Sequence, residues 1–166
     1  MTILLKTKHL IIREFTLDDV ENLSLLLSNK EVMRFSVAGP LSLEQTKEFL
    51  QKRILDHYSQ FGFGLWALIH VENQCFIGCA GLLFQSIDGE NVIELGYRLD
   101  PNYWGKGLAT EAALAISHYA FDQLHMDQLI SIIDPNNQRS LSVASRLKMH
   151  YWKQTVFHGT PVQIYP

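Results

Sequence analysis

The stretch that decides the fold is YWGKGLATE, residues 103–111. It joins an apolar, strand-like run at 92–99 to a long amphipathic run at 108–124. Two glycines flank Lys106 where a helix is expected to begin, so several backbone N–H groups are left without helical partners. A helix N-terminus also adds positive potential at that place. The stretch therefore predicts a site for a phosphate or pyrophosphate group.

The bulk composition sets the class of protein. The 166 residues predict one domain over residues 1–166, and the 47% of hydrophobic residues suffices for its core. The net charge of -3 gives no long-range reason to expect DNA as a partner. No apolar run approaches the ~20 residues needed to cross a bilayer, and residues 1–6 lack the features of a signal peptide. We expect a cytoplasmic monomer or homodimer with no membrane partner.

The two cysteines, Cys75 and Cys79, fall in one expected strand at 75–84. Four residues apart on a strand, they are too distant for a disulfide. Neither has a second cysteine or a nearby histidine with which to hold zinc. We expect both to be reduced packing residues, and we expect no metal.

The remaining patterns predict an α+β fold rather than regular strand–helix alternation. Helices are expected at 16–28, 43–60, 108–124 and 140–147, with Thr16 and Ser42 capping the first two. The expected architecture is a mixed, mostly antiparallel twisted sheet of about seven strands flanked by about four helices. The strands are expected at 10–13, 65–71, 75–84, 92–99, 129–133, 151–157 and 162–165.

Two familiar phosphate-binding motifs do not fit the glycine loop. A P-loop needs Ser or Thr directly after its lysine to bind magnesium, whereas Lys106 is followed by Gly107. A dinucleotide site needs a third glycine and a place in the first strand–turn–helix unit, whereas this loop follows several expected strands. Alone, the glycine pair is a weak signal.

The wider context is more specific. Residues 94–112, ELGYRLDPNYWGKGLATEA, closely resemble the acetyl-CoA loop of the GNAT superfamily of N-acetyltransferases. Residues 135–140, PNNQRS, resemble that superfamily's next motif, an Asn followed three residues later by Ser. LIIR at 10–13 with an acidic helix after it, and FHGTPV at 157–162, resemble the branch that contains the ribosomal-protein alanine and serine N-acetyltransferases. The resemblance covers essentially the whole chain.

The resemblance implies a single acyl-CoA N-acyltransferase domain. It implies acetyl transfer from acetyl-CoA, as cosubstrate, to a primary amine by direct attack. The backbone of Tyr97, Arg98 and Leu99 would pair with the pantetheine arm like an added strand. Asn137 would hydrogen-bond the pantetheine, and Ser140 would lie near the sulfur, where it could steady or protonate the thiolate. The pyrophosphate would be held by the N–H groups of Gly105, Lys106, Gly107, Leu108, Ala109 and Thr110.

Three positions depart from the pattern of many relatives. Trp104 stands where Gln or Arg is frequent, which leaves the loop amides in place. Ala144 stands where a tyrosine acid is frequent, so no tyrosine acid is expected there. Lys148 replaces a glycine near the end of the same helix, which leaves its C-cap open.

Glu94 is the candidate general base. On the expected strand it points to the same side as Gly96 and Arg98. If that side lines the cleft, Glu94 takes a proton from the incoming ammonium through a water molecule. The alternative is an exposed strand carboxylate paired with Arg98. Asp134 is a weaker candidate base, since Asp-Pro also starts turns.

Two side chains of the loop have a structural alternative. Lys106 either contacts phosphate or is simply solvated. Glu111 is expected only to complement the positive end of the helix.

The chemistry needs an uncharged amine. Deprotonation at neutral pH costs roughly 1 kcal/mol for an α-amine and about 4–5 kcal/mol for a lysine. One modest base therefore suits a protein or peptide N-terminal α-amine, and a small-molecule amine is the alternative acceptor. Because Ala144 removes an acid, an acyl-CoA-binding sensor without turnover is a second alternative, and a nucleotide-binding domain is a third.

Overall fold

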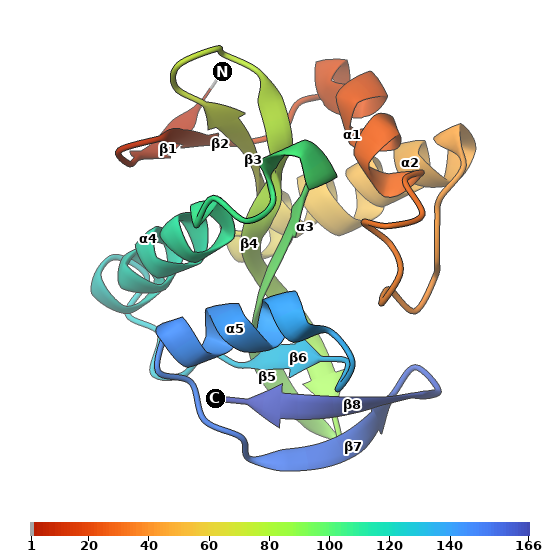
Figure 1. Ribbon diagram of the computed structural model, residues 1–166, viewed down its shortest axis with the longest axis vertical. Coiled ribbons are helices and arrows are strands. Elements are labelled where there is room, and N and C mark those ends of the chain that lie inside the picture. Colours follow the sequence, from red (N-terminus) through yellow and green to blue (C-terminus); the bar gives the residue numbers. More distant parts are fainter. Residues whose placement is uncertain (1) are drawn as a thin grey trace.

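Five antiparallel strands form the main sheet of the computed structural model, which describes residues 2–166 (Figure 1). A second sheet holds three strands in the order β6–β8–β7. The expected α+β class is confirmed, with eight strands in two sheets. In sequence order the strands are β1 (Ile3–Lys6), β2 (Leu10–Arg13), β3 (Leu65–His70), β4 (Phe76–Ile87), β5 (Glu90–Leu99), β6 (Ser131–Ile133), β7 (Lys153–Phe157) and β8 (Thr160–Tyr165).

Strand β1 was not predicted, and the prediction that 10–13 forms the first strand was wrong. The four residues of β1 show no alternation of buried and exposed side chains, because β1 lies at the sheet edge. A period-2 pattern, which identifies half-buried strands, is therefore missing from its sequence.

Ser42 caps its helix as predicted, whereas Thr16 precedes a 3-10 turn, Leu17–Asp19, that leads into the first α-helix. The α-helices are α1 (Val20–Leu27), α2 (Leu43–Phe49), α3 (Asp56–Phe61), α4 (Leu108–Asp122) and α5 (Gln138–Arg146). A π-helical segment, Leu50–Leu55, joins α2 to α3, so one helical stretch runs across 43–61 as expected. Ser42 and Gln45 form a capping box at its start. Among residues 2–166, each helix is too short or too polar to cross a bilayer.

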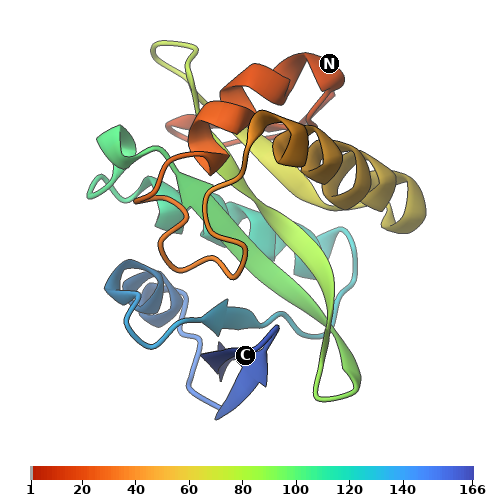
Figure 2. The same ribbon diagram turned by 90° about the vertical axis from the view of Figure 1, so that its right-hand side faces the viewer.

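The main sheet separates two hydrophobic cores (Figure 2). On one face α4 packs its alanines and Ile116 against Leu82 and Leu95. On the other face, α1 and the 43–61 stretch pack against β3 and β4, where Cys79 is buried as expected. Cys75 precedes β4 and is exposed, so its prediction as a packing residue was wrong. Its N–H binds Asn73 Oδ1 (3.0 Å), which places it in the turn.

Among residues 2–166, one isolated bridge joins the two sheets through backbone hydrogen bonds. The bridge is parallel and joins Glu94 of β5 to Ile130, just before β6. Leu95 N–H donates to the Ile130 carbonyl (2.8 Å), and Ile130 N–H donates to the Ile93 carbonyl (3.0 Å). Beyond this bridge β6 pairs with β8. Within residues 2–166, no strand covers the outer edge of β5 from 96 to 99.

A buried ion pair ties β2 to the start of α1. The guanidinium of Arg13 donates to both carboxylate oxygens of Asp19, each at 2.8 Å. Asp19 also accepts from Thr16 N–H (2.8 Å). Burial alone would raise the pKa of Asp19, but these hydrogen bonds and the charge of Arg13 together lower it.

We expect Asp19→Asn to reduce the free energy of unfolding by about 3–5 kcal/mol, because it leaves Arg13 charged, buried and unpaired. Urea unfolding at pH 7 measures the loss. Because the native pKa of Asp19 is lowered, its contribution is present at neutral pH and disappears as the pH falls below the ordinary value of 3.8.

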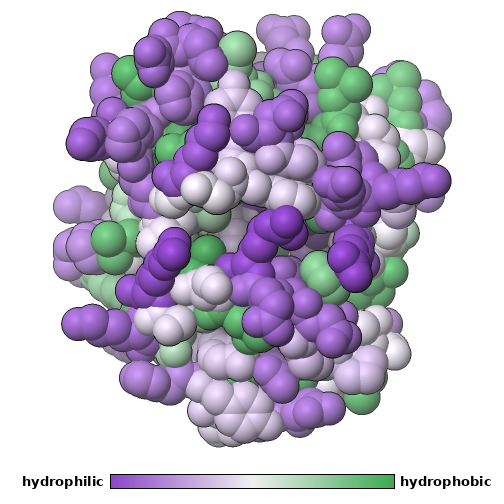
Figure 3. Space-filling view, viewed as in Figure 1, coloured by the Kyte–Doolittle hydropathy of each residue, from purple (hydrophilic) through white to green (hydrophobic). Residues whose placement is uncertain are grey.

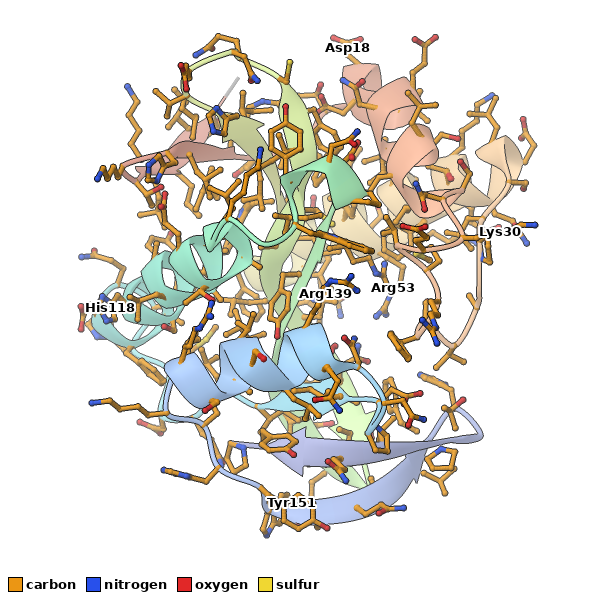
Figure 4. The ribbon with its side chains drawn as sticks, in the orientation of Figure 1. Asp18, Lys30, Arg53, His118, Arg139 and Tyr151 are labelled. Atoms are coloured by element: carbon orange, nitrogen blue, oxygen red, sulfur yellow. The ribbon has the colours of Figure 1, made fainter. Side chains whose placement is uncertain are left out.

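Asp18→Asn is the matched control. Asp18 lies beside Asp19 but is exposed at the upper edge of Figure 4. Its replacement should cost less than about 1 kcal/mol. Equal losses in the two variants would contradict the role given to the buried pair.

Candidate functional site

The loop before α4 leaves a row of N–H groups open. Gly105 and Gly107 adopt left-handed backbone angles, with φ of 73° and 76°, which glycine accepts without strain. Among the hydrogen bonds of residues 2–166, none uses the N–H groups from Gly105 to Thr110. The first paired N–H is that of Glu111, which donates to the Gly107 carbonyl (3.0 Å). Consecutive free donors at the start of a 15-residue helix fit a pyrophosphate.

Two charged side chains at the loop, Lys106 and Glu111, have different surroundings. Lys106 is exposed, and its ammonium lies 5.4 Å from the centre of the Tyr103 ring. The carboxylate of Glu111 accepts from Thr7 Oγ1 (2.5 Å) and from His9 N–H (2.9 Å), and it contacts His9 Nδ1 (2.6 Å). Glu111 thus anchors α4 to the turn between β1 and β2. The structural role expected for Glu111 is present, although its partners were not foreseen.

The open edge of β5 presents the backbone of Tyr97. Leu95 N–H points away from β4 to reach Ile130, so by alternation the N–H and C=O of Tyr97 point the same way. No hydrogen bond of residues 2–166 engages these two groups. Leu99 faces the same side, but its carbonyl accepts from Trp104 Nε1 (2.9 Å).

Arg98 differs from its two neighbours. In the β4–β5 register it lies opposite Cys79, and its carbonyl approaches Gly78. Its backbone N–H and C=O therefore face β4, and its side chain lines both cavities described below. Of the three backbones expected to pair with a pantetheine, those of Tyr97 and Leu99 are on the open edge.

Helix α5 begins opposite this edge. Asn137 caps the helix, since its Oδ1 accepts from Ser140 N–H (3.2 Å). The Ser140 carbonyl accepts from the Tyr97 hydroxyl (3.2 Å), and burial raises the pKa of Tyr97 to about 12. The phenol therefore stays protonated at neutral pH and holds α5 against β5.

The last residues of α5 and those after it include two positions, Ala144 and Lys148, at which this chain departs from the pattern of many relatives. Ala144 is buried among core residues and offers no acid. Lys148 has a φ of 62°, the left-handed angle at which a helix-ending glycine usually stands.

Two cavities adjoin along β5. One, of about 320 Å³, lies near Trp104 and Ala109, next to the glycine loop. The other, of about 360 Å³, contains Glu94. Figure 3 shows this face, where strongly hydrophilic side chains edge the hollow at its centre. The cavities share six lining residues: Val32, Phe35, Tyr97, Arg98, Asn137 and Ser140.

Glu94 lies in the larger cavity and is partly buried. Its Oε1 accepts a hydrogen bond from Gln85 Nε2 (3.0 Å). Burial raises the pKa of Glu94, and the Gln85 hydrogen bond and the charges of Arg98 and Arg53 only partly oppose the rise. A raised carboxyl pKa suits a general base at neutral pH. Across residues 2–166 no ion pair joins Glu94 to Arg98, so the alternative of an exposed, Arg98-paired carboxylate was wrong.

Asp134 lines the same cavity but has a turn role. Its Oδ1 accepts from Asn136 N–H (2.9 Å), as the Asp-Pro pattern predicts. Glu94, whose side chain has no such local backbone partner, remains the stronger candidate base.

Sequence reasoning missed three contributors to the site. The Arg139 guanidinium stacks on Trp104, 3.7 Å from the ring centre, and Figure 4 shows Arg139 at the start of α5. Arg53, from the π-helical segment, lines the Glu94 cavity. The turn at 31–38 lines both cavities through Phe35. Only Arg139 lies within a recognised motif, and its partner is 35 positions away, so no local pattern signals these contacts.

Known proteins share this sequence and fold. A family model described as the Acetyltransferase (GNAT) domain matches residues 9–150. The uncharacterized N-acetyltransferase YnaD of Bacillus subtilis is 32% identical over 143 residues, which cover 86% of this chain and 80% of YnaD.

Solved structures agree with the sequence match. An acetyltransferase of Agrobacterium tumefaciens superposes with a TM-score of 0.82 at 25% identity, covering 97% of this chain and 91% of that one. The ribosomal L7/L12 α-N-protein acetyltransferase RimL, solved with coenzyme A, shares the fold with a TM-score of 0.74 at 23% identity, covering 98% of this chain and 96% of RimL.

We expect Gln85→Met to raise the pKa of Glu94 further, because it removes the hydrogen bond that favours the charged carboxylate. An NMR titration of the Glu94 side-chain carboxyl carbon measures this shift. Gln154→Met, at an exposed position of β7, is the control and should leave the titration unchanged. A pKa that stays the same or falls in Gln85→Met would contradict the assigned contact.

Proposed function

The chain belongs to the GNAT acetyltransferase family and is an N-acetyltransferase, and from this premise we propose that it acetylates the α-amine of a protein or peptide N-terminus, using acetyl-CoA. One observation carries the proposal of the site: a loop with free backbone donors at 105–110 borders one of two adjoining cavities through Ala109, and the carboxyl of Glu94 lines the other. That RimL was solved with coenzyme A supports the choice of cosubstrate.

The residues proposed to bind acetyl-CoA are those whose hydrogen-bonding groups have no partner among residues 2–166. The N–H groups of Gly105 to Thr110 hold the pyrophosphate, with Lys106 beside them. The backbone of Tyr97 and the N–H of Leu99 pair with the pantetheine arm. The Asn137 amide nitrogen, left free by the cap that its oxygen forms, hydrogen-bonds the same arm. This arrangement directs the thioester toward Ser140, where the cavities adjoin.

Bound acetyl-CoA supplies an acetyl group whose leaving group is a thiolate. Glu94 takes the proton of the ammonium through a water molecule, which frees the nitrogen lone pair to form the new C–N bond. The electron pair of the broken C–S bond leaves with sulfur. The acylated nitrogen gives up its surplus proton, through water, to the Ser140 oxygen as the Ser140 hydroxyl gives its own proton to the thiolate, so serine ends the step unchanged. Because one carboxylate serves as base, the low cost of deprotonating an α-amine, roughly 1 kcal/mol, favours it over lysine.

Thiol release from acetyl-CoA tests the function. Peptides with a free α-amine should promote release, and the same peptides with an acetylated N-terminus should not. Coenzyme A binding by calorimetry without release for any amine would support an acyl-CoA-binding module instead. Faster release with small amines than with any peptide would support a small-molecule acceptor.

We expect Gly107→Val to weaken coenzyme A binding at least tenfold. The left-handed φ of 76° disfavours a β-branched residue, and the changed backbone turns the loop donors away from the pyrophosphate. Calorimetry measures the affinity. Gly89→Val is the matched control, because Gly89 also has a left-handed φ, 80°, and open space around a built Cβ, but lies in the β4–β5 turn. Equal affinity in both folded variants would contradict the loop's role.

We expect Glu94→Gln to lower kcat by about 100-fold or more while coenzyme A affinity stays nearly intact. The rise of kcat/KM with pH that follows deprotonation of Glu94 should disappear, since an amide does not titrate. Asp134→Asn should retain that rise. An unchanged pH profile in Glu94→Gln would remove Glu94 from the role of base.

A further inference from the structure

The Glu94 cavity contains two guanidinium groups without a carboxylate partner. Arg53 comes from the π-helical segment and Arg98 from β5, and both line the cavity. In the part of the chain that the structure describes, neither forms an ion pair within 4.0 Å. Arg98 reaches only Ser36 Oγ, at 3.4 Å. Figure 4 shows Arg53 extending from its helix toward the side where α5 begins.

The acidic groups of the same cavity have other partners. Glu94 accepts from Gln85, and Asp134 accepts from the Asn136 backbone. The two guanidiniums are permanently charged and suited to a carboxylate in a planar, two-point contact. In the part of the chain that the structure describes, neither guanidinium forms an ion pair with these acids, so both are free for an anion that enters the cavity.

The spacing limits the kind of anion. Glu94 and Arg98 lie four residues apart on β5, which separates their Cα atoms by about 13 Å. Both side chains line one cavity, so this spacing along β5 sets the scale of the separation between the carboxyl and the guanidinium. A nitrogen beside Glu94 and an anion beside the guanidiniums are therefore several ångströms apart. An acidic side chain in the first residues of a peptide supplies that separation.

We propose that the acceptor carries an anionic group close to its amine, and that Arg53 and Arg98 bind this group. The inference rests on the proposed function, because it names the acceptor of the same site. Arg98 lines both cavities, whereas Arg53 lines only the one that contains Glu94. Arg53 is therefore the residue to replace without altering the cavity beside the glycine loop. Its charge also acts on the pKa of Glu94, so the test compares ratios between acceptors rather than rates.

The test compares peptide pairs that differ only in charge. Peptides with Asp or Glu as first or second residue are assayed beside the same peptides with Asn or Gln, and an α-amino acid is assayed beside its amide. The unaltered protein should favour the acidic member of each peptide pair at least tenfold in kcat/KM. In Arg53→Gln the ratio of acidic to neutral should fall toward one, and high salt should reduce it in the unaltered protein.

Lys52→Gln is the control. Lys52 is adjacent in sequence, but it pairs with Glu48 (3.0 Å) and does not line the cavity. It should keep the preference. A preference confined to the free amino acid over its amide would support the anion site with a small acceptor.

The failures are distinguishable. Equal rates for acidic and neutral acceptors in the unaltered protein would overturn the inference and leave the acetyltransferase intact. An undiminished acidic preference in Arg53→Gln would also overturn it. Absence of thiol release with every amine would overturn the proposed function together with the inference.

Discussion

The site depends on where β5 stops pairing with the second sheet. The hydrogen bonds on either side of the Glu94–Ile130 bridge join the backbones of the two sheets, and β6 then pairs with β8. Backbone groups past that point need partners, because unpaired peptide groups in a buried place are costly. The Tyr97 backbone is left open by this geometry, and α5 begins opposite it. β5 and β6 therefore separate after the Glu94–Ile130 bridge, and this divergence of β5 from β6 leaves a groove between β5 and the start of α5.

The rest of the fold holds this divergence in place. β4 extends beyond the end of β3, and His57 of α3 supplies the missing partner: its Nε2 accepts from Phe84 N–H (3.1 Å), while its Nδ1 binds the Phe63 carbonyl (2.6 Å). Burial lowers the pKa of His57, which favours the neutral ring that both contacts require. The helical stretch that carries Arg53 is thus fixed to the strand next to Glu94.

Local patterns predicted the parts of the molecule that local forces determine. The Gly105 and Gly107 turn and the Ser42 cap each depend on a few neighbouring residues, and both are present. The class of fold followed from the order of such segments. The Trp104–Arg139 stack joins distant segments, so its residues carry no shared signal in sequence. Gln85 and Glu94 lie on the two strands of one hairpin, and their contact depends on its register. The exposed strand β1 lacked a pattern altogether.

The two ends of the groove differ in the same way, since one is built of backbone groups and the other of side chains from several segments. Backbone donors at 105–110 and the backbone of Tyr97 form the end near the glycine loop, so that end is insensitive to most side-chain changes. Side chains from the 31–38 turn, the π-helical segment, β5 and the β7–β8 turn form the other end. The bridge between β5 and Ile130 is made by backbone groups, not by these side chains. In the proposed site, the side chains of the Glu94 cavity determine which amine is preferred, while the backbone that binds the cosubstrate stays the same. These side chains are the ones that sequence patterns predict least.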